Sequence, residues 1–486
     1  MVRMKTLLAA MALTGMIPAT ALAQNEPLSQ ILPNLLLQSV IMRAPVGVPG
    51  FPHEAHFIAA LGQNKTPFEI NRLLVAQLGT FPIGSSSSGF VFNFDPDTGL
   101  FVPASQTFGS EFAERALTNG KGRFGFGVNY QRLQFKSFEG ADLRDGSLAF
   151  ILQHNDCCPP APGGQDPFFE GDLVRMSLSL DVKEDIVAPF INYGINNYWD
   201  VAVVVPIVRV GLRPTIASSV DRISTCPSPT QCNPLIHSWD GLGASTNTPQ
   251  TRTGNASGIG DLVLRTKYRF IDDGASNGVA GGLDVRLPTG DSENLLGTGV
   301  VQIRLLGIAS AEFGRVSPHV NLGYTFSHGE LPASLITLPS SGLPSNAFNP
   351  PTQTQVNAET GTPLADPHLP NEVNFVGGVD VAAHPLLTIS ADFIGRTILN
   401  TPRFATTAKT FNYRTANGAP LLSTDRDTFD ITNTGTLNLL LGVVGAKFNI
   451  PGTPLLLKGN VLFPLTKAGL RPKVTPVVGI DYSFTR

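Results

Sequence analysis

Apolar and polar side chains take turns along much of the chain, and the segment GIGDLVLRTKYRF (residues 258–270) shows the pattern most sharply. As a β-strand, this segment would place its apolar side chains on one face and its charged side chains on the other. The apolar face would hold Leu262, Leu264, Tyr268 and Phe270, and the charged face would hold Asp261, Arg265, Lys267 and Arg269. The segment therefore predicts a strand between hydrocarbon on one side and a polar environment on the other.

The same alternation recurs in segments spread over the rest of the chain. These are RFGFGVNYQ (123–131), VRMSLSLDVK (174–183), GLDVRL (282–287), VVQIRLLGI (300–308), SPHVNLGYTFS (317–327), TISADFIGR (388–396) and LLLKGNVLF (455–463). A soluble sandwich also alternates, so the pattern alone does not decide between a sandwich and a membrane barrel.

Three further features favour a transmembrane barrel. Arg, Lys and Asp stand in the middle of the polar faces, whereas the apolar faces are almost free of charge. The segments run to about 10–16 residues, and a tilted strand needs about 9–11 to cross a bilayer. Short connections (272–277, 313–315, 384–385, 451–452) alternate with long ones (153–169, 214–257, 329–370, 400–434), as in outer-membrane barrels.

The predicted fold class is therefore all-β: a transmembrane antiparallel β-barrel of about 12–14 strands with a short, partly helical N-terminal segment. Residues 171–196 could be one long strand or two strands that turn at Lys183–Asp185, and we favour one. An even total would then require an extra strand near residues 108–118. Apolar groups should face lipid and charged groups the lumen, because Arg or Lys on the lipid side costs about 2–4 kcal/mol at the midplane.

The N-terminal region predicts three units before the barrel. Residues 1–23 have the basic head, apolar middle and small-residue end of a signal peptide, with cleavage expected after Ala23. Residues 24–85 carry Leu, Ile and Val at helical spacing and form either a packing segment or a plug. Residues 86–107 form a hairpin and linker, and residues 108–486 form the barrel.

The C-terminal segment VVGIDYSFTR resembles the last strand of outer-membrane proteins. The resemblance rests on Gly479, Tyr482 and Phe484, a glycine followed by two aromatic residues two positions apart. It implies the outer membrane as location, its lipid as a partner, and recognition of this strand by the barrel assembly machinery.

Composition excludes one class of partner and leaves the redox question open. The formal net charge is −3, or −5 without Arg3 and Lys5, so we expect no nucleic-acid partner. The four cysteines fit an oxidising compartment. Cys226 and Cys232 could close a small loop, but the sequence does not choose among the pairings that Cys157 and Cys158 also allow.

The segments GIGDLVLRTKYRF and GGLDVRLPTGDSENLLGTG (281–299) resemble the family called "MetA-pathway of phenol degradation". The likeness rests on Gly258, Gly260 and Asp261, on the run Tyr268–Phe270, and on Leu287–Asp291. It implies a barrel channel for aromatic or other poorly soluble compounds, and it carries over no catalytic residue.

The sequence shows no catalytic, metal-binding or cofactor-binding constellation, so we expect no cofactor, no metal and no enzyme activity. We expect a channel for passive passage of small, aromatic or hydrophobic solutes. The alternatives are a non-conducting barrel that binds a partner and, less favoured, a barrel lipid hydrolase. The inward charges would either select ions or pair with one another. The candidate pore-lining residues are Asp261, Arg265, Lys267, Arg269, Asp284, Arg286, Gln302, Arg304, Asp380, Asp392, Arg396 and Lys458.

Overall fold

The chain folds into a closed antiparallel barrel of 12 strands with additional short strands at its margins. The structure is a computed structural model, and it describes residues 26–43, 56–80, 82–85, 92–95, 100–103, 105–154, 171–223, 237–273, 277–337, 365–414 and 419–485. The predicted signal peptide and all four cysteines lie outside the described residues.

The wall is a succession of neighbouring antiparallel strands, as predicted. In order around the barrel these are β3 (Arg123–Phe138), β6 (Leu173–Gly194), β7 (Trp199–Val204) continued by β8 (Ile207–Asp221), β10 (Gly254–Ile259) continued by β11 (Leu262–Asp272), β12 (Gly278–Leu287), β13 (Val301–Ser310), β14 (Val316–His328), β15 (Glu372–His384), β16 (Leu387–Arg414), β17 (Pro420–Asn449), β18 (Leu455–Pro464) and β20 (Thr475–Thr485). The barrel closes where β20 pairs with β3, with Ile480 opposite Val128.

Two of the strands are interrupted at the same height of the wall. Pro206 separates β7 from β8, because proline has no N–H to contribute to the ladder. Gly260 and Asp261 separate β10 from β11, and the Gly260 N–H donates to the Pro206 carbonyl at 2.8 Å. The ladder therefore continues across both breaks.

The remaining elements lie at the ends of the barrel or inside it. The short strands are β1 (Phe92–Asp95), β2 (Leu100–Pro103), β4 (Ala141–Asp142), β5 (Leu148–Gln153), β9 (Gln250–Thr251) and β19 (Leu470–Pro472). The helices are α2 (Leu28–Gln38), α3 (His56–Gln63) and α4 (Thr66–Leu78), with short 3-10 turns η1 (Ser292–Asn294) and η2 (Ala333–Leu335). No helix in the described part of the chain is long and apolar enough to span a bilayer.

The outer face of the wall carries apolar side chains that are exposed. Examples from across the barrel are Ile191, Leu305, Leu322, Phe393 and Ile480, each between 47 % and 61 % exposed. Such a belt around a closed sheet is the signature of a transmembrane barrel, because lipid tolerates apolar surface and closure pairs every backbone group. The predicted lipid-facing side is confirmed for Leu305, Leu322, Phe393 and Ile480.

Connections of two kinds define the two ends of the barrel. Short turns lie between β6 and β7, β11 and β12, β13 and β14, β15 and β16, and β17 and β18, and this end is called the turn end. The other connections, most of which are longer, define the opposite loop end. The predicted short turns are confirmed, and residues 171–196 hold the single long strand β6.

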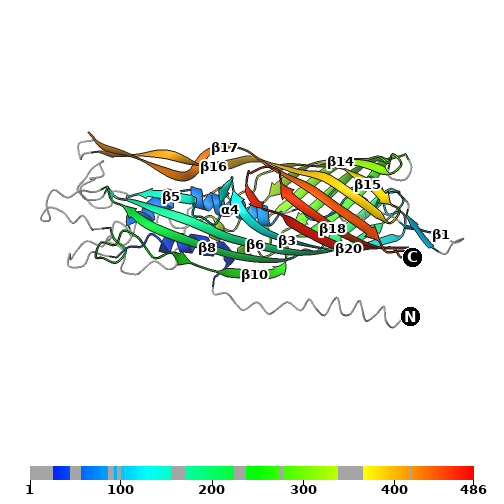
Figure 1. The fold of residues 1–486 in the computed structure, drawn as a ribbon, viewed down its shortest axis with the longest axis horizontal. Helices are drawn as coiled ribbons and strands as arrows, with labels where there is room; N and C mark the ends of the chain where they lie inside the picture. The colour runs from blue at the N-terminus through cyan, green and yellow to red at the C-terminus, as the bar shows by residue number, and fades with distance from the viewer. Residues whose placement is uncertain are drawn as a thin grey trace.

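Three sequence expectations about strands are wrong. Residues 214–257 are not a loop throughout, because β8 continues to Asp221 and β10 begins at Gly254. Residues 108–118 form no strand, because they lie inside the barrel and bond to its wall instead of joining its ladder. Residues 400–434 are not a loop, because β16 and β17 continue through most of this range as a paired hairpin. In Figure 1 this hairpin (orange) reaches beyond the other strands.

Strand β6 exchanges its apolar face along its length. Towards the turn end its outward residues are apolar, as at Ile191 and Tyr193. Towards the loop end its inward residues, such as Met176 and Leu178, are apolar and fully buried, while Arg175 and Ser177 face outward. That is the reverse of the expected orientation. An outward face that carries charge suits water and not lipid, so we place this part of the strand outside the bilayer.

The apolar interior of the loop end encloses the helices. Leu32, Phe68 and Leu74 belong to one buried cluster with Met176 and Leu178. Every residue of α4 is buried. Figure 1 shows the helices (blue) surrounded by the extended strands, and the β1–β2 hairpin at the opposite, turn end of the barrel. The N-terminal part of the chain therefore passes through the lumen.

Candidate functional site

Two stretches of the N-terminal part occupy the lumen. Residues 79–80 and 82–85, here called the upper luminal segment, follow α4. Residues 105–119, the lower luminal segment, return from the β1–β2 hairpin and precede β3. The two segments meet where the Ser85 N–H donates to the Glu111 carbonyl and the Ser85 hydroxyl donates to Glu114.

All twelve candidate pore-lining residues lie on the inward register of the wall. Nine of them are buried (Asp261, Lys267, Arg269, Asp284, Gln302, Asp380, Asp392, Arg396 and Lys458), and Arg265, Arg286 and Arg304 are partly exposed to the lumen. Nine of them bond to one of the two luminal segments, either directly or through one or two other residues of the wall, as described next.

Glu111 of the lower luminal segment is held by lysines from two neighbouring strands. Lys458 on β18 lies 3.0 Å from the Glu111 carboxylate, and Lys447 on β17 lies 3.9 Å from it. Lys458 also pairs with Asp481 on β20 at 2.8 Å. All four side chains are at most 3 % exposed, so charges of both signs neutralise one another within the lumen.

Glu114 joins the same segment to the opposite side of the wall. Its carboxylate lies 2.8 Å from Arg265 and 3.4 Å from Lys267, both on β11. Lys267 also donates to the carbonyls of Arg115 and Leu117. Arg265 forms a second ion pair with Asp284 on β12 at 2.8 Å, and Arg304 on β13 donates to the same carboxylate.

A buried histidine lies between two carboxylates that contact the lower segment. His319 on β14 has its Nδ1 3.3 Å from Asp380 and its Nε2 2.7 Å from Asp392. Asp380 pairs with Arg115 at 3.4 Å, and Asp392 accepts from the Ser110 hydroxyl at 2.6 Å. This cluster links the lower segment to β14, β15 and β16.

The upper luminal segment is fastened by arginines. Arg286 on β12 donates to the Gly79 carbonyl at 2.6 Å, and Arg396 on β16 donates to the Thr80 hydroxyl at 2.5 Å. Arg396 also pairs with Glu372 on β15 at 2.6 Å.

The remaining three candidates bond elsewhere. Asp261 accepts from the N–H groups of Gly290 and Thr298 and so organises the β12–β13 connection. Arg269 pairs with Asp272 at 2.7 Å near the turn end, and Gln302 donates to Ser327 at 3.1 Å.

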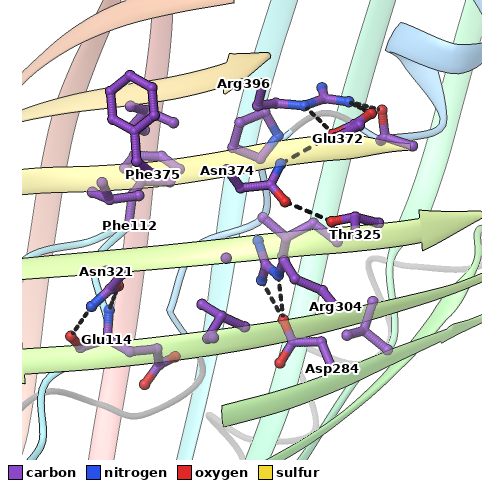
Figure 2. Close-up of a pocket in the computed structure, with 18 of the residues that line it drawn as sticks. Phe112, Glu114, Asp284, Arg304, Asn321, Thr325, Glu372, Asn374, Phe375 and Arg396 are labelled. Carbon is purple, nitrogen blue, oxygen red and sulfur yellow. Dashed lines mark hydrogen bonds and ion pairs between the residues drawn. The ribbon is translucent and has the colours of Figure 1, made fainter. Parts of the chain in front are cut away.

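A chamber of about 110 Å³ lies between the two luminal segments and the wall, with room for several water molecules. Figure 2 shows its polar side, where Arg304 lies against Asp284, Arg396 against Glu372, and Asn374 bridges Glu372 and Thr325. Its apolar lining includes Ile83, Phe112, Val263, Leu306, Val376 and Ile394.

The sequence pattern identified most of the wall residues of this network but not the residues of the lower luminal segment that they contact. Glu111, Glu114 and Arg115 lie in no alternating segment, so period-two analysis had no reason to select them. The cluster of charges in the run EFAER (111–115) was the available signal. Glu372 and Asp481 do stand at inward positions of strands and were overlooked.

Among the described residues, no group of three or more His, Cys, Asp or Glu side chains is arranged to hold a metal ion. The proposed Cys226–Cys232 pair falls outside the described ranges.

Comparison of folds finds outer-membrane proteins of very low sequence identity. The COG4313 outer membrane channel from Pseudomonas putida F1 matches with a TM-score of 0.39 and 9 % identity over 76 % of this chain and 98 % of that chain. A FadL homologue from Pseudomonas aeruginosa matches with a TM-score of 0.34 and 11 % identity over 84 % and 97 %. The toluene transporter TbuX from Ralstonia pickettii matches with a TM-score of 0.24 and 9 % identity over 75 % and 90 %. At such TM-scores the likeness is too loose to carry an argument about substrate or mechanism.

Comparison of sequences gives one positive finding. No curated protein matches the chain. The model of the family described as "Putative MetA-pathway of phenol degradation" matches residues 193–330. This range contains β7 to β14 and both motifs on which the sequence resemblance rests. The resemblance of this transmembrane barrel to the phenol-degradation family is therefore confirmed for residues 193–330.

Proposed function

We propose that the protein is an outer-membrane channel for the passive passage of small molecules, and that the N-terminal part of the chain closes its lumen. The observation that supports this most is that the charged inner wall is matched by the lower luminal segment, which is no part of the wall. If that segment moves, the same charges line a water-filled passage.

The size of the barrel is consistent with this proposal. Barrels of about eight strands fill their interior with wall side chains, and barrels of about 16–18 strands leave an aqueous channel. A 12-stranded barrel lies between these cases. Here the interior at the height of the bilayer is occupied chiefly by two stretches of chain that have no strand pairing to the wall. Their displacement would open a path without breaking the ladder.

The family match supports an aromatic or otherwise poorly soluble solute, since its description refers to phenol degradation. Export would use the signal peptide cleaved after Ala23, and the barrel assembly machinery would recognise β20 as the last strand. The channel would need no energy source beyond the solute gradient.

A non-conducting barrel is the second candidate, and the closely bonded lumen favours it. Its partner-binding surface would be the loop end, which extends furthest from the bilayer through β16 and β17.

A disulfide between the lower segment and the wall would separate the two candidates. The Thr107 hydroxyl lies 2.9 Å from the Ser317 hydroxyl at the start of β14, and both residues are buried. Cysteines in these places would bring their sulfur atoms close enough to bond after small adjustments. The test measures planar-bilayer conductance of the full chain carrying Thr107→Cys and Ser317→Cys, before and after reduction.

The channel proposal expects wild-type openings, few openings in the oxidised double variant, and their return after reduction. Each single cysteine variant serves as the matched control and should be insensitive to the reductant. Wild-type protein that inserts without any conductance, under reducing and oxidising conditions alike, would establish the non-conducting alternative.

A further inference from the structure

The chamber between the two luminal segments is lined by more arginine side chains than carboxylates. Four guanidinium groups line it, those of Arg265, Arg286, Arg304 and Arg396. Three carboxylates line it, those of Glu114, Asp284 and Glu372. The lining therefore has one positive charge in excess.

The excess is located at Arg286 and Arg304. Arg265 is enclosed between Asp284 and Glu114, and Arg396 is engaged by Glu372. Arg304 shares the Asp284 carboxylate with Arg265, and its side chain is 33 % exposed. Arg286 donates to the uncharged Gly79 carbonyl and, within the described residues, forms no ion pair. Both guanidinium groups thus present N–H donors to the chamber.

Apolar side chains complete the lining of the chamber. Ile83 and Phe112 come from the two luminal segments, and Val263 and Leu306 come from β11 and β13. A neutral solute would offer no negative charge to Arg286 and Arg304, whereas a small inorganic anion would leave the apolar groups without contacts. An apolar body that carries one carboxylate satisfies both.

We propose that the chamber binds small aromatic carboxylates, with the carboxylate on Arg286 and Arg304 and the ring against Phe112 and Leu306. A planar guanidinium matches a carboxylate through two parallel hydrogen bonds, which favours a carboxylate over a neutral hydroxyl group. The chamber's position between the segments that close the lumen makes it a resting site on the solute path. This inference rests on the proposed channel function, and it narrows the class of solutes that the channel would pass.

Binding can be measured without transport. Equilibrium dialysis of the full chain in detergent would compare benzoate with benzyl alcohol, which has a similar ring and no charge, and with acetate, which has the charge and no ring. We expect benzoate to bind at least about tenfold more tightly than either, a difference of about 1.4 kcal/mol. Equal binding of benzoate and benzyl alcohol would overturn the inference.

Two variants test the location of the site, and either one alone is sufficient if the other fails to fold. Arg286→Gln and Arg304→Gln should each weaken benzoate binding by about tenfold or more, with little change for benzyl alcohol. The matched control is Arg213→Gln, since Arg213 is exposed on β8 and does not line the chamber. Folded variants of both chamber arginines that bind benzoate as the wild type does would refute the assignment.

The outcome is distinguishable from failure of the channel. Benzoate binding that depends on Arg286, in a protein that conducts no solute, would reject the channel and retain the chamber. Conductance without any preference for benzoate would do the reverse.

Discussion

The Lys458 ammonium on β18 and the Glu111 carboxylate on the lower luminal segment lie 3.0 Å apart, and both side chains are at most 2 % exposed. One partner belongs to the barrel wall and the other to a stretch of chain that is no part of the wall. The ion pair therefore couples the position of the lower segment to the charge of the lumen. Removing one partner of such a buried pair leaves the other charge poorly compensated, which is strongly unfavourable.

Replacing Glu111 by Gln should loosen the lower luminal segment. Loss of one partner of a buried pair costs about 3–5 kcal/mol, and we expect the lower end here because Lys458 keeps Asp481 at 2.8 Å. Channel openings in a planar bilayer should become at least about tenfold more frequent, since about 1.4 kcal/mol suffices for that factor.

The control for this variant is Glu139→Gln. The Glu139 side chain is also buried, and it forms an ion pair with Arg403 at a distance of 2.9 Å. This pair lies away from the lower segment. The control variant should lower stability without raising the frequency of openings. An equal rise in both variants would show that general destabilisation, and not release of the lower segment, opens the barrel.

Alternation predicted the strands and the direction of their side chains because neighbouring residues on a strand must face opposite ways. Arg265, Lys267 and Lys458 were therefore placed on the inward face correctly. The pattern could not predict that Glu111 and Glu114 meet them, because the lower segment has no period and its contacts span up to hundreds of residues. The pattern also could not tell which medium surrounds each part of β6. The alternation of Arg175 and Met176 is the same whether the apolar face points to lipid or to the interior.

The medium outside the wall can be tested by placing an arginine at each of two positions on the outer face. Leu305→Arg puts a charge on the outer face at the middle of β13, where the leucine is 52 % exposed. We expect a loss of about 2–4 kcal/mol in the free energy of unfolding in liposomes, as for arginine near a bilayer midplane.

The matched control is Ser179→Arg on the outer face of β6 towards the loop end, where Asp181 and Lys183 already face water. Its effect should stay within about 0.5 kcal/mol, as for ordinary surface substitutions. Similar losses at both positions would contradict the placement of the bilayer around the turn-end part of the barrel.

Because β6 exchanges its apolar face, truncating an apolar side chain should cost more stability near the loop end of the strand than near the turn end. Leu178 is fully buried against the helical core, whereas Ile191 on the same strand is 47 % exposed to lipid. Leu178→Ala should cost about 2–5 kcal/mol through the cavity it leaves. Ile191→Ala should cost clearly less, because lipid chains fill the space. Urea unfolding in liposomes measures both, and equal costs would mean that the helices do not pack on this face.

The tip of the β16–β17 hairpin offers a test by pH. A strand crosses a bilayer with about 9–11 residues, so the last part of the 28-residue β16 stands outside it. Tyr413 there is 1 % exposed, packs with Phe411, Ile151 and Leu173, and donates its hydroxyl to the Gly171 carbonyl. Burial raises the pKa of Tyr413 well above its ordinary value, and the nearby Asp172 and Asp221 carboxylates raise it further.

A raised pKa means that the folded hairpin favours the neutral phenol. The stabilisation is therefore fully present below the ordinary tyrosine pKa of about 10 and is lost as the pH rises through the higher pKa of the folded state. Ultraviolet difference absorbance between the wild type and Tyr413→Phe isolates this phenol, and it should ionise well above pH 10. At neutral pH the same variant should lose about 0.5–1.5 kcal/mol of stability with the hydrogen bond and keep its conductance. Ionisation near pH 10, as for an exposed tyrosine, would show that the hairpin tip does not dock against Gly171.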